Sequence, residues 1–315
     1  MRAQLDLQKM NASPVLPLQT PVDLPPCPFR LTTESRIVLL GSCFAQYVGE
    51  RLADVLPEGQ VSVNPFGVLY NPRSVAAALS GGEEPLMRGS DGLWRSWRRS
   101  GLFAAPTEEA LRAMLRPVPE DCDTVVVTFG TTRHYRLAES PETVVANCHR
   151  EPAARFTETD DSVDALLAIW DGLMRRELAG RRVVFTVSPY RYAKYGLHAS
   201  QICKAKLLLL VDELCSHHAA AVYFPAYEIL LDELRDYRFY APDMLHPSPQ
   251  AADYIAARFA RWAFSDELAA FAAEKQQLNA ARAHRTLHPE SAEAEIFAQR
   301  LAEREKAFAA KWGKR

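Results

Sequence analysis

Three features are scarce in this 315-residue sequence, and each scarcity argues against a class of protein. No apolar run approaches the roughly 20 residues that a membrane-spanning helix needs. The six cysteines are widely spaced and form no CxxC pair, so neither a disulfide framework nor a structural zinc site is expected. Basic residues are not in excess, since 37 Lys and Arg face 39 Asp and Glu. We therefore expect no nucleic-acid partner and no membrane partner.

The beginning of the chain lacks the pattern of a secretory signal. Residues 1–10 carry Arg2, Asp6 and Lys9 among scattered apolar residues, without a continuous apolar stretch. Residues 1–35 are rich in proline and predict an extended lead-in rather than a helix. With reduced thiols as the default, we expect a cytoplasmic protein.

Apolar strands alternate with helical patterns through residues 36–263. Short β-branched runs predict strands, each ending near Gly or Pro, at residues 36–40, 124–128, 183–187 and 221–224. Helical spacing follows Ser42 and recurs over residues 162–178, 200–216 and 249–263. In the second of these ranges the apolar residues at helical spacing are Ile202, Ala205, Leu208, Leu209 and Leu214. The fold class expected is α/β, a three-layer α/β/α sandwich with a mainly parallel sheet.

The end of the chain has a different composition. Residues 264–315 are rich in Ala, Glu, Lys and Arg, with helical periodicity and a break near His288 and Pro289. We expect a helical C-terminal extension that packs on the sandwich or supports assembly into a homo-oligomer. The expected organisation is a lead-in over 1–35, a catalytic domain over 36–263 and this extension over 264–315.

Ser42 lies where the first strand turns into a helix, in Gly41-Ser42-Cys43-Phe44-Ala45. A serine there projects from the carboxyl edge of a parallel sheet, where open α/β folds bind ligands. The amides of the following helix can also stabilise an oxyanion. The alternative is that Ser42 only caps the helix. Cys43, one residue into the helix, is expected to point back toward the sheet and not to act as a nucleophile.

A second group of catalytic residue types occurs late in the chain, in Asp243-Met244-Leu245-His246. An Asp three residues before a His can accept the imidazole Nδ1–H and support the imidazolium. The alternative is a surface turn with a solvated Asp and an exposed His. Taken with Ser42, the order Ser early and Asp and His late differs from nucleophile-elbow hydrolases, and the sequence has no GxSxG.

These motifs resemble those of the GSCFA family, a branch of the SGNH or GDSL-like hydrolases. The family's name string is present literally at residues 41–45. Further matching stretches lie at residues 63–72, 128–131, 145–149, 188–191, 243–248 and 284–285. The resemblance implies an SGNH fold and a triad of Ser42, His246 and Asp243.

The resemblance also implies other site residues. In SGNH enzymes a glycine of the second block donates its N–H to the oxyanion, and here that residue is Gly67, alongside the N–H of Ser42. The third block usually offers an Asn side chain, but this chain has Gly130-Thr131-Thr132-Arg133. Thr131, Thr132 or Asn147 could take that place by hydroxyl or amide donation.

Further polar residues follow the matching strands. Asn64 either lines the site or shapes a turn, whereas Asn71 is expected to shape a turn before Pro72. Arg191 either binds an acidic group of the substrate or forms a structural salt bridge. No metal and no organic cofactor are implied.

The sequence therefore predicts a serine hydrolase of the SGNH type, an esterase or deacetylase. By analogy with the superfamily, its substrate would be a small-molecule or carbohydrate O-acyl ester. An O-acyltransferase with the same triad is one alternative. A non-catalytic binding module is another, because the third-block Asn is missing and the helical tail could recruit a partner.

Overall fold

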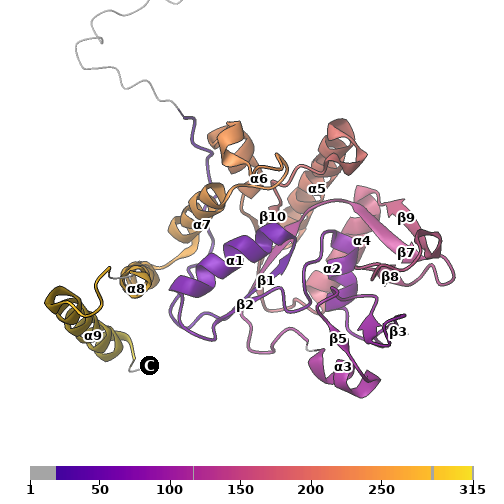
Figure 1. The fold of residues 1–315 in the computed structure, drawn as a ribbon. Helices are drawn as coiled ribbons and strands as arrows, with labels where there is room; N and C mark the ends of the chain where they lie inside the picture. The colour runs from indigo at the N-terminus through magenta and orange to yellow at the C-terminus, as the bar shows by residue number, and fades with distance from the viewer. Residues whose placement is uncertain (1–18, 116, 285–286, 314–315) are drawn as a thin grey trace, which may run out of the picture.

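A five-stranded parallel sheet forms the centre of the molecule (Figure 1). The computed structural model describes residues 19–115, 117–284 and 287–313. The strands run in the order β11-β10-β6-β1-β2. Their bounds are β1 Ile37–Gly41, β2 Val61–Val63, β6 Thr124–Phe129, β10 Arg182–Val187 and β11 Ala221–Tyr223. The α/β fold with a parallel sheet is confirmed, and only the short β2, which pairs with β1, was not expected.

Helices cover both faces of this sheet, because successive side chains of each strand point to opposite sides. Along β1, Val38 and Leu40 join one core, whereas Ile37 and Leu39 join the other. The first core is closed by α2 (Pro72–Leu79), α4 (Val163–Arg175) and α5 (Leu197–His217). The second is closed by α1 (Cys43–Val55) and α7 (Pro249–Ala263). The result is the expected three-layer sandwich.

Two small antiparallel sheets lie beside α2, away from α7 (Figure 1). The first contains β3 (Leu86–Arg88), β4 (Trp94–Ser96) and β5 (Ala104–Ala105), followed by α3 (Glu108–Met114). The second contains β7 (Arg133–Leu137), β8 (Val144–Val145) and β9 (Phe156–Asp160). Short helical segments complete the fold: η2 (Ala153–Arg155), η3 (Ala193–Tyr195), α6 (Ala226–Glu228), η4 (Ile229–Glu233) and η5 (Tyr237–Phe239).

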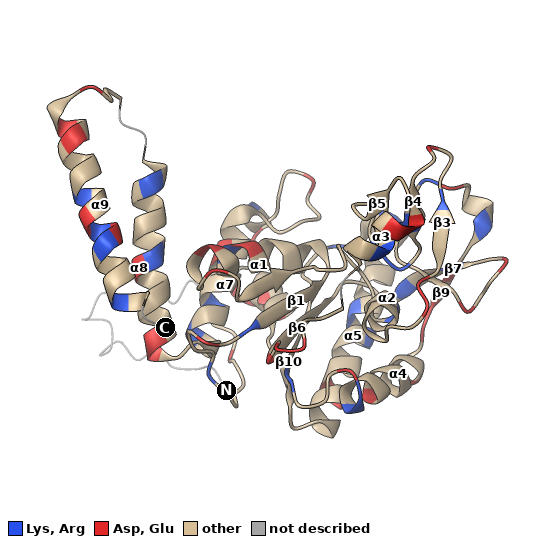
Figure 2. Ribbon diagram, turned by 90° about the horizontal axis from the view of Figure 1, so that it is seen from below, with Lys and Arg blue, Asp and Glu red and all other residues tan. Residues whose placement is uncertain are grey.

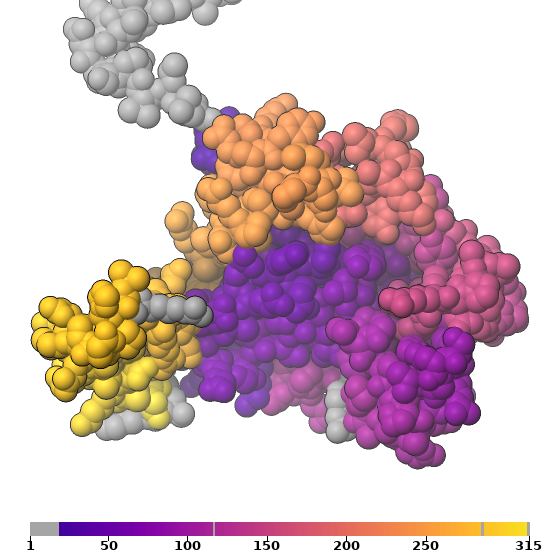
Figure 3. Space-filling view, viewed as in Figure 1, coloured from indigo at the N-terminus to yellow at the C-terminus, as the bar shows by residue number. Residues whose placement is uncertain are grey.

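The C-terminal extension is a pair of helices, α8 (Asp266–Ala283) and α9 (Ala292–Trp312). Leu268 of α8 joins the core beneath α1 and α7, which anchors the pair. Figure 2 shows the two helices side by side and projecting from the sandwich, and Figure 3 shows them as a separate lobe. The N-terminal lead-in, from residue 19 onward, runs along α7, where Trp262 donates to the Pro25 carbonyl.

Some sequence-based expectations fall on residues outside the described ranges. Residues 1–18 hold the first part of the proline-rich lead-in, and Arg285 belongs to the last matching stretch. Within the described part of the chain, no helix combines the length and the apolarity that a membrane span needs.

Candidate active site

The sheet topology brings the site's elements together at the carboxyl ends of β1 and β6. The chain moves from β1 to β2 on one side and then returns to β6 on the other, which makes this the switch point of a doubly wound sheet. In the register, Gly41 of β1 lies opposite Thr128 of β6, so Ser42 and Gly130 follow neighbouring strand ends. A Cβ on Gly130 would lie 3.7 Å from the Ser42 Cβ.

The turn before Ser42 depends on a glycine. Gly41 has φ +128°, and a Cβ there would lie 2.1 Å from the Thr128 carbonyl oxygen. Only glycine can therefore bring this backbone so close to β6. The Gly41 amide donates to Asn64 Oδ1 at 2.9 Å, which fixes the turn from the other side.

The Ser42 hydroxyl does not cap the helix that it precedes. The other α-helices that begin after Ser, Thr or Asn are capped by that side chain, which accepts a first-turn amide: Asn71, Thr107, Ser162, Ser248, Ser265 and Ser291. Ser42 stands at the N-cap position of α1 and makes no such bond. Its Oγ is buried and has no hydrogen-bond partner among the described residues. The helix-cap alternative is thus wrong for this hydroxyl.

Asp243 and His246 form a hydrogen-bonded pair in the loop before α7. Asp243 Oδ2 lies 2.5 Å from His246 Nδ1. Asp243 Oδ1 accepts the amides of Leu245 and His246, at 2.9 and 3.0 Å. The bond to His246 and these amides lower the pKa of Asp243 to about 2. The carboxylate therefore stays ionised and can hold the proton on Nδ1, which leaves Nε2 as the acceptor.

The pair lies at the carboxyl edge of the sheet, the edge at which Ser42 follows β1, because the Arg191 amide beyond β10 donates to the Leu245 carbonyl. The Tyr190 ring is 4.5 Å from the His246 ring, centroid to centroid. Burial raises the pKa of Tyr190, and Cys43 and Asp243 add to this rise. No hydrogen bond joins Ser42 Oγ to His246 in the described structure. The complete triad therefore stays a prediction.

The expected oxyanion donors have other partners in this structure. Gly67 ends a tight turn in which its N–H donates to the Asn64 carbonyl at 2.7 Å. The Ser42 N–H donates to the Thr128 carbonyl at 3.3 Å. Thr131 Oγ1 accepts the Arg133 amide at 3.3 Å, and Thr132 Oγ1 donates to Asp160 Oδ1 at 2.5 Å. To serve an oxyanion, the two amides and the Thr132 hydroxyl would have to share or break these bonds. The Thr131 hydroxyl only accepts in its bond, so its own hydrogen is left to donate.

Asn147 is also engaged in local structure. It follows β8, and its Oδ1 accepts the His149 amide at 2.8 Å. Its Nδ2 is 3.9 Å from where a Cβ on Gly101 would lie, among the small antiparallel sheets. Its part as an oxyanion donor stays a prediction.

Asn64 and Asn71 shape backbone near the site. Besides accepting from Gly41, Asn64 donates through Nδ2 to Gln46 Oε1 at 3.0 Å. Asn64 is buried, and its bond to the Gly41 amide positions the turn before Ser42. Asn71 Oδ1 accepts the Ser74 amide at 2.7 Å and caps α2, which agrees with the turn role expected for it.

Arg191 ties the loop of Asp243 and His246 to the end of β10. Its Nη1 donates to the Met244 carbonyl at 3.0 Å, and its backbone amide donates to the Leu245 carbonyl at 3.0 Å. Its guanidinium lies over the rings of Tyr237 and Tyr240. Within the described chain it forms no salt bridge with a carboxylate, so the structural salt-bridge alternative is not found.

Lys204 is a residue of this region that the sequence pattern did not reveal. It comes from α5, is 2% exposed, and its Nζ donates to the carbonyls of Gly130 and Ser188 at 2.6 and 2.7 Å. Burial lowers the pKa of Lys204 to about 7. Through its two hydrogen bonds, Lys204 holds the ends of β6 and β10 together beneath the site.

The apolar pattern around Lys204 matches the buried face of α5 only in part. Of the apolar residues at helical spacing, Leu214 is buried, whereas Ile202 and Leu209 are 46% and 57% exposed. The buried face instead runs through Cys203, Lys204 and Leu207. The sequence signal that could have revealed Lys204 is its position within this apolar face of the helix. Lysine is almost never fully buried unless its charge has a partner.

Two other chemistries have little support at this site. Burial raises the pKa of the Cys43 thiol, so that it stays protonated near neutral pH and is a poor nucleophile. No cluster of three or more His, Cys, Asp or Glu side chains that could hold a metal occurs among the described residues.

Comparison with known proteins gives the family. The model of the GSCFA family matches residues 36–259, which is most of the chain. The chain belongs to the GSCFA family. No curated protein matches it significantly. The family match ends within α7, so residues 284–285 lie outside it.

Solved structures with a similar fold include SGNH hydrolases. A candidate SGNH hydrolase from Slackia heliotrinireducens is 15% identical, with 72% of this chain and 97% of that chain covered and a TM-score of 0.40. A variant of the acetylxylan esterase Axe2 from Geobacillus stearothermophilus is 12% identical, with 75% and 100% covered and a TM-score of 0.39. The catalytic domain of peptidoglycan O-acetyltransferase A from Streptococcus pneumoniae is 12% identical, with 72% and 91% covered and a TM-score of 0.36.

Proposed function

We propose that this GSCFA protein is a serine esterase of the SGNH type that acts on O-acyl esters. One observation carries the proposal: a buried Ser42 hydroxyl that caps no helix follows the first strand, at the same edge of the sheet as the bonded Asp243–His246 pair. The Ser42 hydroxyl, at the switch point of the sheet, forms no structural hydrogen bond in the described chain. A histidine whose Nδ1 is held by a carboxylate is prepared to act as a base through Nε2.

In the proposed reaction, Ser42 Oγ attacks the ester carbonyl carbon while its proton passes to His246 Nε2. The tetrahedral intermediate breaks its C–O bond, and the leaving alcohol takes that proton. Water then attacks the acyl-Ser42 ester, gives its proton to His246, and releases the carboxylic acid as Ser42 Oγ recovers the proton. Asp243 keeps the imidazole in one tautomer throughout.

Two adjustments would accompany substrate binding in this proposal. Ser42 and the loop of residues 243–246 would approach each other to form the Oγ–Nε2 hydrogen bond, which is often loose without ligand. The first-turn amides of α1, which Ser42 does not cap, would offer the positive end of the helix to the oxyanion. Gly67 would add a further donor once its bond to the Asn64 carbonyl is shared, and Thr131 or Asn147 would donate through hydrogens that their present bonds do not use.

A fluorophosphonate probe tests the proposal, because it labels an activated serine. The wild type should be labelled at Ser42, and Ser42→Ala should not be labelled. Ser265→Ala serves as the matched control, since Ser265 only caps α8 and its loss should leave labelling intact. Labelling that persists in Ser42→Ala would identify another nucleophile. A folded wild type that is neither labelled nor active on p-nitrophenyl acetate would favour the binding-module alternative.

A further inference from the structure

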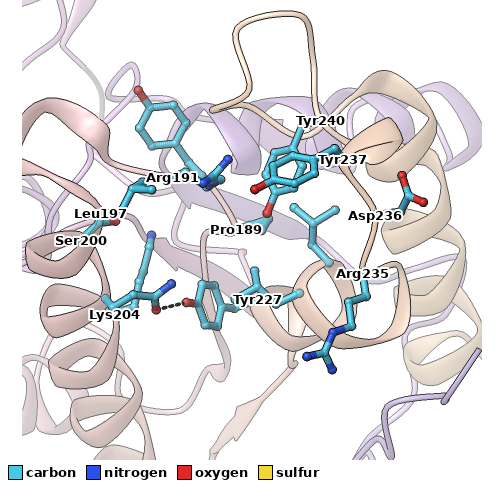
Figure 4. Close-up of a pocket in the computed structure, with 14 residues that line it drawn as sticks. Pro189, Arg191, Leu197, Ser200, Lys204, Tyr227, Arg235, Asp236, Tyr237 and Tyr240 are labelled. Carbon is cyan, nitrogen blue, oxygen red and sulfur yellow. Dashed lines mark hydrogen bonds between the residues drawn. The ribbon is translucent and has the colours of Figure 1, made fainter.

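A cavity of about 280 Å³ is lined by Arg191, the residue that bonds to the loop of Asp243 and His246 (Figure 4). Its walls come from α5, from the segment of α6 and η4, and from residues 235–240. Aromatic rings of Tyr190, Tyr227, Tyr237 and Tyr240 surround it, with leucine side chains between them. Flat, partly polar faces of this kind stack on rings, and the volume admits one ring with its substituents.

The cavity contains positive charge that no carboxylate balances. Arg191 and Lys204 both line it, and neither forms a salt bridge with a carboxylate in the described part of the chain. Figure 4 shows the two on the same side of the cavity, opposite Arg235 and Asp236. Asp236, the acidic residue of the lining, is bonded to Arg238 at 2.8 Å.

Lys204 has unused capacity for a ligand. Two of the three ammonium donors are bonded to the carbonyls of Gly130 and Ser188. Those carbonyls are neutral, so the buried charge has hydrogen bonds without a counter-ion. An unbalanced buried cation is costly, and an anion beside it removes part of that cost.

The same residues connect the cavity to the proposed catalytic loop. Tyr190 contacts both the cavity and the His246 ring, 4.5 Å away. Arg191 contacts the cavity and holds the Met244 carbonyl between Asp243 and His246. A group bound in the cavity therefore lies next to the residues that position the proposed general base.

We infer that this cavity binds a carboxylate carried on a ring, as part of the substrate of the proposed esterase. The Arg191 guanidinium and the Lys204 ammonium receive the carboxylate, and the tyrosine rings stack on the body that carries it. The inference rests on the proposed function for the ester chemistry. A sugar acid and an aromatic acid share the required chemistry.

Carboxylate binding is coupled to protonation of Lys204. The titratable groups that face Lys204 are Cys43 of α1, Cys203 of its own helix and Tyr227 of α6. Burial raises the pKa values of Cys43 and Tyr227, so neither of these two carries negative charge near neutral pH. The pKa of Lys204 is about 7, so the bound anion raises it and the complex takes up a proton at about pH 8.

The test compares matched charged and neutral probes by calorimetric titration of the full chain. Benzoate is paired with benzamide, and D-glucuronate with D-glucose. Charged hydrogen bonds predict that at least one carboxylate binds about 10- to 100-fold more tightly than its neutral partner. The pair in which the carboxylate gains more affinity over its neutral partner shows whether the bound group is an aromatic acid or a sugar acid. Equal affinity within both pairs, or no binding of any probe, would overturn the inference without needing a variant.

Variants and competition then locate the bound anion. Arg191→Met and Lys204→Met should each reduce the preference for the carboxylate about 10-fold, and Lys204→Met should abolish proton uptake. Arg175→Gln and Lys206→Met are matched controls, because these residues lie on α4 and α5 and pair with Asp171 and Asp160 outside the cavity. The carboxylate should compete with p-nitrophenyl acetate, and binding without competition would refute a substrate role. Fluorophosphonate labelling of Ser42 is measured without any carboxylate present, so it tests the proposed nucleophile alone, and failure of the two proposals can be told apart.

Discussion

Replacing the buried lysine with methionine, Lys204→Met, should change how stability depends on pH. Lys204 is 2% exposed, and burial lowers its pKa from 10.5 to about 7. Between these values the unfolded chain holds a proton on Lys204 that the folded chain lacks. Stability from this group therefore rises with pH across that window, by about 1.4 kcal/mol per pH unit. Below about pH 7 both states are protonated, and the cost of burying the charge is fully present.

The magnitude follows from the two pKa values. The whole window amounts to at most about 5 kcal/mol, which the wild type gains relative to Lys204→Met between pH 7 and 10.5. The variant also leaves the carbonyls of Gly130 and Ser188 without the lysine, at about 1–3 kcal/mol each. This second cost does not depend on pH. When the stability difference between wild type and variant is plotted against pH, the shifted pKa gives the slope and the lost hydrogen bonds give a constant offset.

Urea unfolding at a series of pH values from 6 to about 10 measures both the slope and the offset. The difference between wild type and Lys204→Met should widen in favour of the wild type as the pH rises. Lys206→Met is the control, because Lys206 is half-buried on the same helix and paired with Asp160. Parallel curves for wild type and Lys204→Met would refute the buried, neutralised lysine.

Three further predictions concern Asp243 and Asp161. Asp243→Asn should lower kcat on short esters about 10²- to 10⁴-fold, because the amide cannot hold His246 in the required tautomer. The pKa of Asp243 is about 2, so its carboxylate is lost only as the pH falls through that value, and an acid limb of the wild-type pH–rate profile nearer neutrality must come from another group. Asp161→Asn should lower the unfolding free energy by about 3–5 kcal/mol in urea unfolding, because buried Asp161 binds Arg73 through two hydrogen bonds, at 2.8 and 3.1 Å. A loss below 1 kcal/mol would show that water can replace that pair.

Several parts of the fold could not be predicted from short-range patterns. The strand β2 (Val61–Val63) has three residues, and its central Ser62 breaks the apolar run. The small antiparallel sheets are built from strands of two to five residues, too short for a periodic pattern to stand out. Their existence depends on pairing between distant segments, such as Arg133 with Asp160.

The oxyanion donors could not be settled from sequence for a different reason. Whether an amide is available depends on which carbonyl lies opposite it in the folded chain. Gly67 has the glycine backbone that the resemblance implies, with φ +76°, but its N–H closes a turn onto Asn64. Similarly, Asn64 could be named as a polar residue near the site, although its bond to the Gly41 amide is visible only in three dimensions.

By itself, the sequence determined the layered α/β fold and the strand-to-helix position of Ser42. These follow from hydrophobic periodicity and from glycine, which act over a few neighbouring residues. The pairing of Asp243 with His246 was equally local, because three residues separate them. Only the tertiary structure decided that the Ser42 hydroxyl caps nothing, and that Lys204, not Ile202, faces the core. Those outcomes depend on burial and on partners from distant strands, so the charged cavity beside the loop of Asp243 and His246 forms only when α5 packs against the ends of β6 and β10.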